Sequence, residues 1–194
     1  VSVENTSGKL EFEVRGGTFG DEGGPAGGIS TTRQGIYLQP GSSATIHATI
    51  EGVEFKAHAG PHVDYNSAGT GAGTFVVRGN TMTGGHPNPG SVSSIIEIGA
   101  QASWTGSLEY LIENNTIRHA RAGSIRVWPI ETSSGGVLMG RIRNNVAGGP
   151  DENECGTTFL EMSGIHDGVH VAAIHDNSAE NCGTSGIWYV SRAG

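Results

Sequence analysis

Six polar or aromatic residues recur along the chain, each between two apolar residues. These six are Tyr37, Asp64, Glu97, Arg126, Glu161 and Trp188. An apolar–polar–apolar pattern is typical of a short strand with one face buried, so each of the six is expected to point outward. If the strands stack side by side, the six side chains share one strip. Carboxylates accept hydrogen bonds from sugar hydroxyls and aromatic rings stack on sugar CH faces, so the strip suits carbohydrate binding.

The spacing of the acids also raises a catalytic alternative. On stacked strands Asp64 and Glu97 would lie about 5 Å apart, near the carboxylate separation of retaining glycosidases. Glu97 and Glu161 would lie about 10 Å apart, just beyond the separation of inverting glycosidases. The structural alternative is ordinary charge pairing, because Arg126 falls between Glu97 and Glu161. Asp64, Glu97 and Glu161 are therefore only catalytic candidates. Trp128, two residues after Arg126, is expected on the same face and completes the predicted binding set.

A repeated phrase sets the positions of these strands. Leu111 to Ile117 reads apolar, apolar, charged, turn-forming, Asn, small, apolar, and five similar phrases occur along the chain. The fifth position of each phrase falls at residues 17, 53, 80, 115, 145 and 177. A recurring phrase with a period of roughly 20–50 residues is the signature of a repeat architecture.

Each repeat contains two clear strands, which predicts the fold. One strand leads into the phrase and carries inward columns such as Leu10/Phe12/Val14 and Ile46/Ala48/Ile50; the other carries the outward strip. No amphipathic helix is visible. We predict an all-β, right-handed parallel β-helix of about six coils, with two to three short strands per coil, over residues 1–194 as one unit. In the sixth coil Val169 and Val171 would suit the core better than His170, so we expect a bulge or register change there.

The Asn-Asn-Thr, Gly-Asn-Thr, Asn-Asn-Val and Asp-Asn-Ser phrases carry a family resemblance. The chain resembles the pectate-lyase-like superfamily of right-handed β-helices and the β-helix repeats of bacterial surface and secreted proteins. That resemblance implies a polysaccharide laid along an outer face. The pectate lyase Trp-Ile-Asp-His stretch and the polygalacturonase motifs are missing, which argues against an enzyme of either family.

Stacking the repeats predicts three ladders. Asn80, Asn115, Asn145 and Asn177 form an asparagine ladder, which we interpret as structural. The outward residue two positions before each anchor is, coil by coil, Arg15, Glu51, Arg78, Glu113, Arg143 and His175, and its charge alternates until the last. Cys155 and Cys182 fall at matching positions of successive coils, within disulfide range, so we predict a disulfide and hence a secreted, periplasmic or cell-surface protein.

The composition and net charge disfavour some classes of binding partner. The net charge is −8 and only Lys9 and Lys56 are lysines, which disfavours nucleic acid and any polybasic membrane patch. No apolar run approaches the length of a membrane span. We expect no cofactor and no metal site, with calcium at acidic loops as the weaker alternative.

Three functions remain open. The first is a non-catalytic scaffold that presents its acidic and aromatic face to carbohydrate or to a protein partner. The second is a polysaccharide lyase or glycoside hydrolase with its site between Asp64 and Glu161. The third is a self-assembling fibre or sheath subunit, since the sequence starts inside a strand and stops just after Val190; we expect the chain to be a segment of a longer protein, or to form homo-oligomers by end-to-end stacking.

Overall fold

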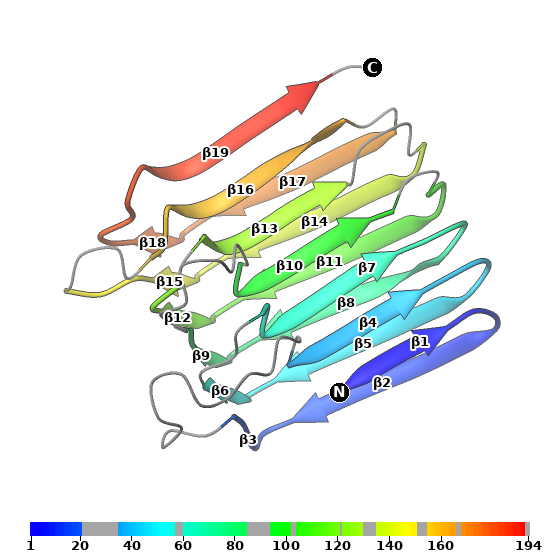
Figure 1. Cartoon of the computed structure of the whole chain (residues 1–194), viewed down its shortest axis with the longest axis horizontal. Helices are drawn as coiled ribbons and strands as arrows, with labels where there is room; N and C mark the ends of the chain where they lie inside the picture. The colour runs from blue at the N-terminus through cyan, green and yellow to red at the C-terminus, as the bar shows by residue number, and fades with distance from the viewer. Residues whose placement is uncertain are drawn as a thin grey trace.

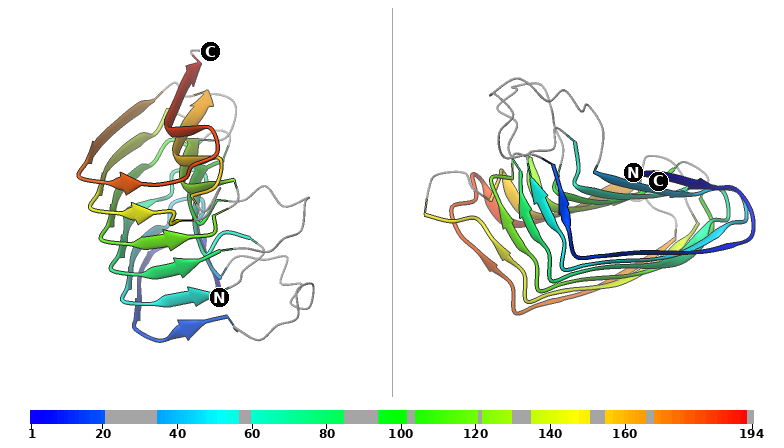
Figure 2. Two further views of the ribbon diagram at one scale, coloured as in Figure 1. Left: turned by 90° about the vertical axis from the view of Figure 1, so that its left-hand side faces the viewer. Right: turned by 90° about the horizontal axis from the view of Figure 1, so that it is seen from below.

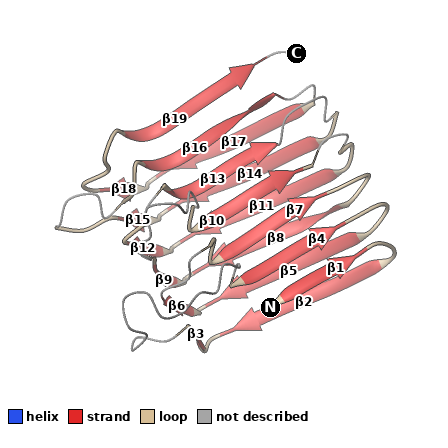
Figure 3. Ribbon diagram, viewed as in Figure 1, coloured by secondary structure: helices blue, strands red, loops and turns tan. Residues whose placement is uncertain are grey.

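The chain forms a parallel β-solenoid in which three sheets run along one axis (Figure 1). This computed structural model describes residues 1–20, 35–56, 60–84, 94–101, 104–120, 122–129, 135–150, 155–165 and 168–192; the side chains of residues 129, 163–165, 185 and 190–192 are not described. Every element in the described residues is a strand (Figure 3). Successive strands visit the three sheets in a fixed order, so that each coil adds one strand to every sheet.

We name the sheets A, B and C in the order in which the chain visits them. Sheet A, which carries the predicted strip, consists of β1 (Ser2–Asn5), β4 (Ile36–Pro40), β7 (Val63–Ser67), β10 (Ile96–Ala100), β13 (Gly123–Pro129), β16 (Thr158–Ile165) and β19 (Ser185–Arg192). Sheet B consists of β2 (Lys9–Arg15), β5 (Thr45–Glu51), β8 (Ala72–Arg78), β11 (Ser107–Glu113), β14 (Val137–Arg143) and β17 (Val169–His175). Sheet C consists of β3 (Thr18–Phe19), β6 (Glu54–Lys56), β9 (Thr81–Thr83), β12 (Thr116–Arg118), β15 (Val146–Ala147) and β18 (Ser178–Ala179).

The observed register matches the predicted columns. Leu10 pairs with Ile46 and Ile46 with Gly73, while Tyr110 lies between Phe75 and Gly140. Sheets B and C have six strands each, as six coils require, but sheet A has a seventh because Ser2–Asn5 pairs with β4. The repeat phrase did not reveal β1 because no anchor precedes it. A view along the axis shows the three sheets enclosing the interior (Figure 2).

Inward side chains of all three sheets form one continuous core. Ile46, Phe55 and Ile96, one from each sheet, are fully buried, and rings such as those of Phe19 and Phe55 stack from coil to coil at 5.4 Å. No single coil encloses its own apolar side chains, so each coil depends on its neighbours for burial.

The corner between sheets B and C explains the repeated phrase. The fourth position of the phrase has a left-handed backbone in every coil. The φ angle there lies between 53° and 64° in Gly16, Gly52, Gly79, Asn114, Asn144 and Asp176. Glycine, Asn and Asp are the residues that adopt this conformation at least cost, which accounts for the turn-forming residue there. The anchor that follows is buried in Asn80, Asn115 and Asn145 and half-buried in Asn177.

The asparagine ladder is confirmed as a directional chain of amide hydrogen bonds. The Nδ2 of Asn80 donates to Oδ1 of Asn115 at 2.9 Å, and the same bond links Asn115 to Asn145 and Asn145 to Asn177. Each Oδ1 also accepts the backbone N–H of the preceding anchor residue, which is Val53 in the case of Asn80. Each Nδ2 also donates to a carbonyl, such as that of Val77 for Asn115. All polar atoms of a buried amide are thereby paired, which is the condition for burying it without penalty.

The sixth coil corrects one expectation. β17 continues the register of β14 without a bulge, so that His170 points inward and Val169 and Val171 are 52% and 57% exposed. An inward histidine is accepted because Tyr110 reaches across two rungs: its ring lies over Gly140, and its hydroxyl is 3.0 Å from Nε2 of His170. The alternation of Val169 and Val171 predicted core positions, but both valines lie on an exposed surface of the molecule.

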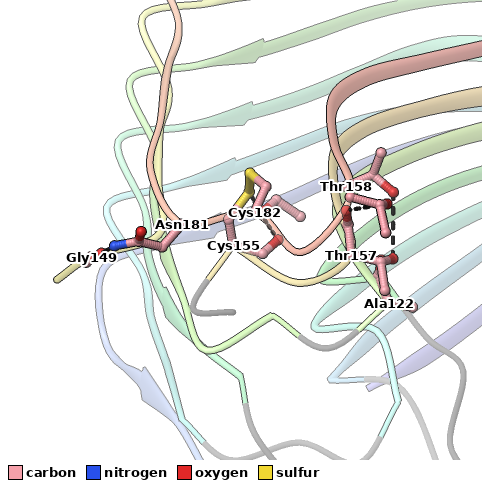
Figure 4. Close-up of a disulfide and its surroundings, with 9 residues drawn as sticks. Ala122, Gly149, Cys155, Thr157, Thr158, Asn181 and Cys182 are labelled. Atoms are coloured by element: carbon pink, nitrogen blue, oxygen red, sulfur yellow. Dashed lines mark hydrogen bonds between the residues drawn. A yellow bond between two sulfur atoms is a disulfide. The ribbon is translucent and has the colours of Figure 1, made fainter. Parts of the chain in front are cut away.

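The last two coils are joined by the predicted disulfide. Cys155 and Cys182 are bonded with a Cα–Cα distance of 4.6 Å, and Asn181 adds a hydrogen bond to the Gly149 carbonyl nearby (Figure 4). Such bonds are typical of proteins in oxidising compartments. The alternating charges are also in register: Glu51 is paired with both Arg15 and Arg78, and Glu113 with Arg143 at 2.7 Å, whereas His175 pairs with its neighbour Asp176.

Candidate binding face on sheet A

The six strip residues lie in one outward column of sheet A. Tyr37 pairs with Asp64, Asp64 with Glu97, and the column continues rung by rung through Arg126 and Glu161 to Trp188. Parallel strands lie about 4.8 Å apart, so five rung spacings extend the column over ~24 Å. Residues spread over most of the chain are thereby brought to one face, as the sequence predicted.

Arg126 organises the middle of this column. Its guanidinium lies 3.6 Å from a Glu97 oxygen and 3.3 Å from a Glu161 oxygen, so it bridges the two acids on either side. It also stacks over the Trp128 ring, with Cζ 3.9 Å from the ring centroid. These side chains are largely shielded: the side chains of Glu97 and Glu161 are only 13% and 14% exposed. The group is a partly buried charge network rather than a row of separate solvated charges.

Glu97 is the electrostatically unusual member of the network. Burial raises the pKa of the Glu97 carboxyl, while Arg126 opposes that rise and the charge of Glu161 adds to it. A hydrogen bond from the Trp128 side chain also stabilises the carboxylate. Asp64, on the adjacent rung, is buried with 7% exposure. A carboxyl group with a raised pKa beside a second carboxyl is typical of general acids. Here the bridging arginine opposes that role, because it lowers the pKa of Glu97.

The neighbouring outward column contains a notch. Asn66, Gly99 and Trp128 occupy the same position on three successive strands, so the middle rung lacks a side chain. A Cβ placed on Gly99 would lie 3.5 Å from Oδ1 of Asn66 and 3.6 Å from Nε1 of Trp128. Within the described residues, Oδ1 of Asn66 is buried and has no hydrogen-bond partner. Buried acceptors are seldom left unpaired, so an unpaired oxygen beside a position without a side chain is unusual.

Aromatic side chains stand at both ends of the strip. Tyr37 is partly buried, and its pKa is raised by burial and by the nearby charge of Asp64, while its side chain is hydrogen-bonded to Asn66. Trp188, on the last strand, is 49% exposed. Trp128, in contrast, has one ring face occupied by Arg126. Trp188 is therefore exposed, whereas Tyr37 and Trp128 are both half-buried.

Sequence reasoning found the column but missed the notch. Gly99 has no side chain and lies in a strand, so its residue type alone does not distinguish it among the 33 glycines of the chain. The alignment of repeats did place it between Asn66 and Trp128, and that position was the available signal.

Other candidate sites add little. Among the described residues, no group of three or more His, Cys, Asp or Glu side chains is arranged to hold a metal ion. The described part of the chain also has no helix long and apolar enough to cross a membrane. The Asn ladder and the disulfide occupy the corner and the interior, where their contacts are with the protein itself.

Comparisons with known proteins add no family assignment. No protein-family model, curated protein or solved structure matches the chain. The parallel β-solenoid is therefore established by the structure alone, and the resemblance to the pectate-lyase-like superfamily stays a prediction.

Proposed function

We propose that the protein is a non-catalytic β-solenoid that binds carbohydrate along the outer face of sheet A, in a secreted, periplasmic or cell-surface setting. The observation that carries this proposal is the notch at Gly99, where the unpaired Oδ1 of Asn66 lies next to the Trp128 indole. A turn of the Asn66 side chain toward the notch would let a sugar hydroxyl donate to that oxygen and satisfy the acceptor, and such precisely placed polar groups give carbohydrate sites their specificity. Tyr37 and Trp188 would stack on sugar rings further along the strip.

The charge network supports binding over catalysis. Arg126 pairs with both Glu97 and Glu161, which holds the two acids as a fixed surface rather than as an acid and a base with separate partners. The strip has three acids and one arginine, so it favours neutral sugars over sugars that carry carboxylates, because like charges repel. The disulfide supports an oxidising setting outside the cytoplasm.

The test uses a panel of neutral and acidic oligosaccharides with the intact, oxidised chain. We expect a neutral oligosaccharide to bind, measured by calorimetry, without any cleavage. Gly99→Val should abolish binding because it fills the notch, whereas Gly186→Val, on an outward position of β19 with open space around it, should not. Gly99→Ala, which meets only ordinary contacts, serves as the check that the strand tolerates a side chain. Binding by Gly99→Val equal to that of the wild type would contradict the proposal.

A hydrolase is the second candidate, because the raised pKa of Glu97 next to Asp64 suits a general acid with a neighbouring carboxylate. It predicts reducing ends released from an oligosaccharide of the panel, with the activity lost in Glu97→Gln. Absence of released ends after prolonged incubation with every bound sugar would remove this candidate.

A further inference from the structure

The outer face of sheet B changes character along the axis. Its first strand presents Lys9, Glu11, Glu13 and Arg15, which pair with one another or with Glu51. Its last two strands instead expose Met139, Val169 and Val171, at 42%, 52% and 57%. Contiguous exposed apolar side chains rimmed by polar residues are characteristic of interaction surfaces.

A groove of about 680 Å³ runs over this apolar region. Its walls are two neighbouring outward columns of β8, β11, β14 and β17, which contribute Thr74, Glu109, Met139 and Val171 on one side and Val76, Leu111, Arg141 and Ala173 on the other. The groove lies on a different sheet from the strip and shares no residue with it.

Two opposite charges, Glu109 and Arg141, line the groove. Within the described part of the chain, neither Glu109 nor Arg141 makes an ion pair or side-chain hydrogen bond, although nearby Arg143 is paired with Glu113. Glu109 pairs in register with Met139, and Leu111 pairs with Arg141. The acid and the base are therefore diagonal neighbours, one rung and two residues apart, with Leu111 and Met139 on the other diagonal.

We propose that this groove is the interface of a symmetric homodimer. In a two-fold dimer the same surface meets itself, so every residue on one copy must face its complement on the other. An axis lying in the interface along the Leu111–Met139 diagonal places Glu109 against the partner's Arg141, and Arg141 against the partner's Glu109. Two ion pairs form, and the apolar side chains of Leu111 and Met139 meet near the axis.

A second copy is favoured over another occupant because the patch carries both halves of the pair. One unpaired acid and one unpaired base, separated by apolar residues, complement each other across a two-fold axis, whereas an apolar ligand alone would leave both charges without partners. The diagonal axis makes the strands of the two copies cross at a steep angle, near the orthogonal arrangement in which sheets are known to pack face to face.

The test is a charge swap, measured by sedimentation equilibrium on the oxidised chain. The wild type should dimerise, and Glu109→Arg or Arg141→Glu should each weaken the dimer by at least about tenfold, because each creates two like-charge contacts. The double variant Glu109→Arg/Arg141→Glu should dimerise as the wild type does. An equimolar mixture of the two single variants should form a heterodimer, because both of its ion pairs then have opposite charges.

Matched controls separate the interface from net charge. Glu180→Arg and Arg118→Glu change the charge of the chain by the same amounts at exposed positions outside the groove, and both should leave the dimer unchanged. Far-ultraviolet circular dichroism would confirm that each variant is folded. A wild type that stays monomeric at every concentration would overturn the proposal, as would single variants without effect or a mixture that fails to associate.

Discussion

At the scale of the residue, the anchor asparagines join the corners of four successive coils by hydrogen bonds. Asn115 accepts from the backbone N–H and the Nδ2 of Asn80, and donates to the Val77 carbonyl and to Asn145. Asn114, one residue earlier, is exposed and supplies only a left-handed backbone with φ of 56°. Two adjacent asparagines therefore have different physical roles.

Replacing each of them should separate these roles. Asn115→Ala leaves several buried donors and acceptors unpaired and should lower the free energy of unfolding by about 3 kcal/mol or more. Asn114→Gly preserves the left-handed turn and should change it by less than about 0.5 kcal/mol. Denaturant titration followed by circular dichroism measures both. Equal effects of the two substitutions would show that the ladder contributes no more than the turn.

Arg126 gives a pH-dependent prediction at the same scale. Burial raises the pKa of Glu97 and Arg126 holds the rise in check, so Arg126→Gln should raise that pKa further. A carboxyl with a raised pKa in the folded state binds its proton more tightly there than in the unfolded state. Stability is then lost as the pH rises from the unfolded carboxyl pKa, about 4.3, through the folded one.

The loss in the free energy of unfolding caused by Arg126→Gln should therefore be small at acidic pH and grow toward neutral pH. Unfolding titrations at a series of pH values would measure it, with Arg118→Gln as a control at an exposed arginine. Adding Glu97→Gln should remove most of the pH-dependent part of the difference. A cost that stays constant with pH would mean that Arg126 contributes by packing on Trp128 alone.

At the scale of the element, the last coil is the least enclosed. Ile187 and Tyr189 occupy the inward positions of β19 yet are 54% and 64% exposed, because no further described strand covers them. The disulfide from Cys155 to Cys182 joins this coil to the one before it across 27 residues. It is the covalent link at the point where burial contributes least.

Removal of the disulfide should loosen that coil selectively. In the chain-entropy description a loop of this length is worth about 3.5 kcal/mol, so Cys155→Ser/Cys182→Ser should destabilise the fold by roughly that amount. Hydrogen exchange should accelerate in β17, β18 and β19 while β8 and β11 keep their protection. An acceleration spread evenly over all rungs would contradict a local role for the bond.

Most of the pairing between elements could be predicted from the sequence. The columns of sheets A and B, the Asn ladder, the disulfide and the alternating charges were all predictable, because one repeat fixes the register of every coil. The inward position of His170 was not predictable from the sequence. It depends on a hydrogen bond with Tyr110, whose ring passes over Gly140 from two strands away. β1 and the notch at Gly99 were missed for a related reason, since neither carries a side-chain pattern of its own.

At the scale of the whole molecule, the stacked coils place residues that are far apart in the sequence in one straight column. Tyr37 and Trp188 are separated by most of the described chain, yet they mark the two ends of one strip about five rung spacings, or ~24 Å, in length. The proposed dimer groove lies on sheet B, so sheet A would stay open to a ligand in the assembly. We propose that the strip acts as one extended binding surface.

Calorimetry should measure the affinity of the wild-type protein for one series of neutral oligosaccharides of increasing length, because an extended surface binds longer chains more tightly. We predict that affinity rises with each added sugar unit until the oligosaccharide is as long as the strip, and then stays level. Trp188→Ala, at the exposed end, should shorten the length at which the plateau begins. An affinity that is the same for a disaccharide as for the longest chain would contradict the claim.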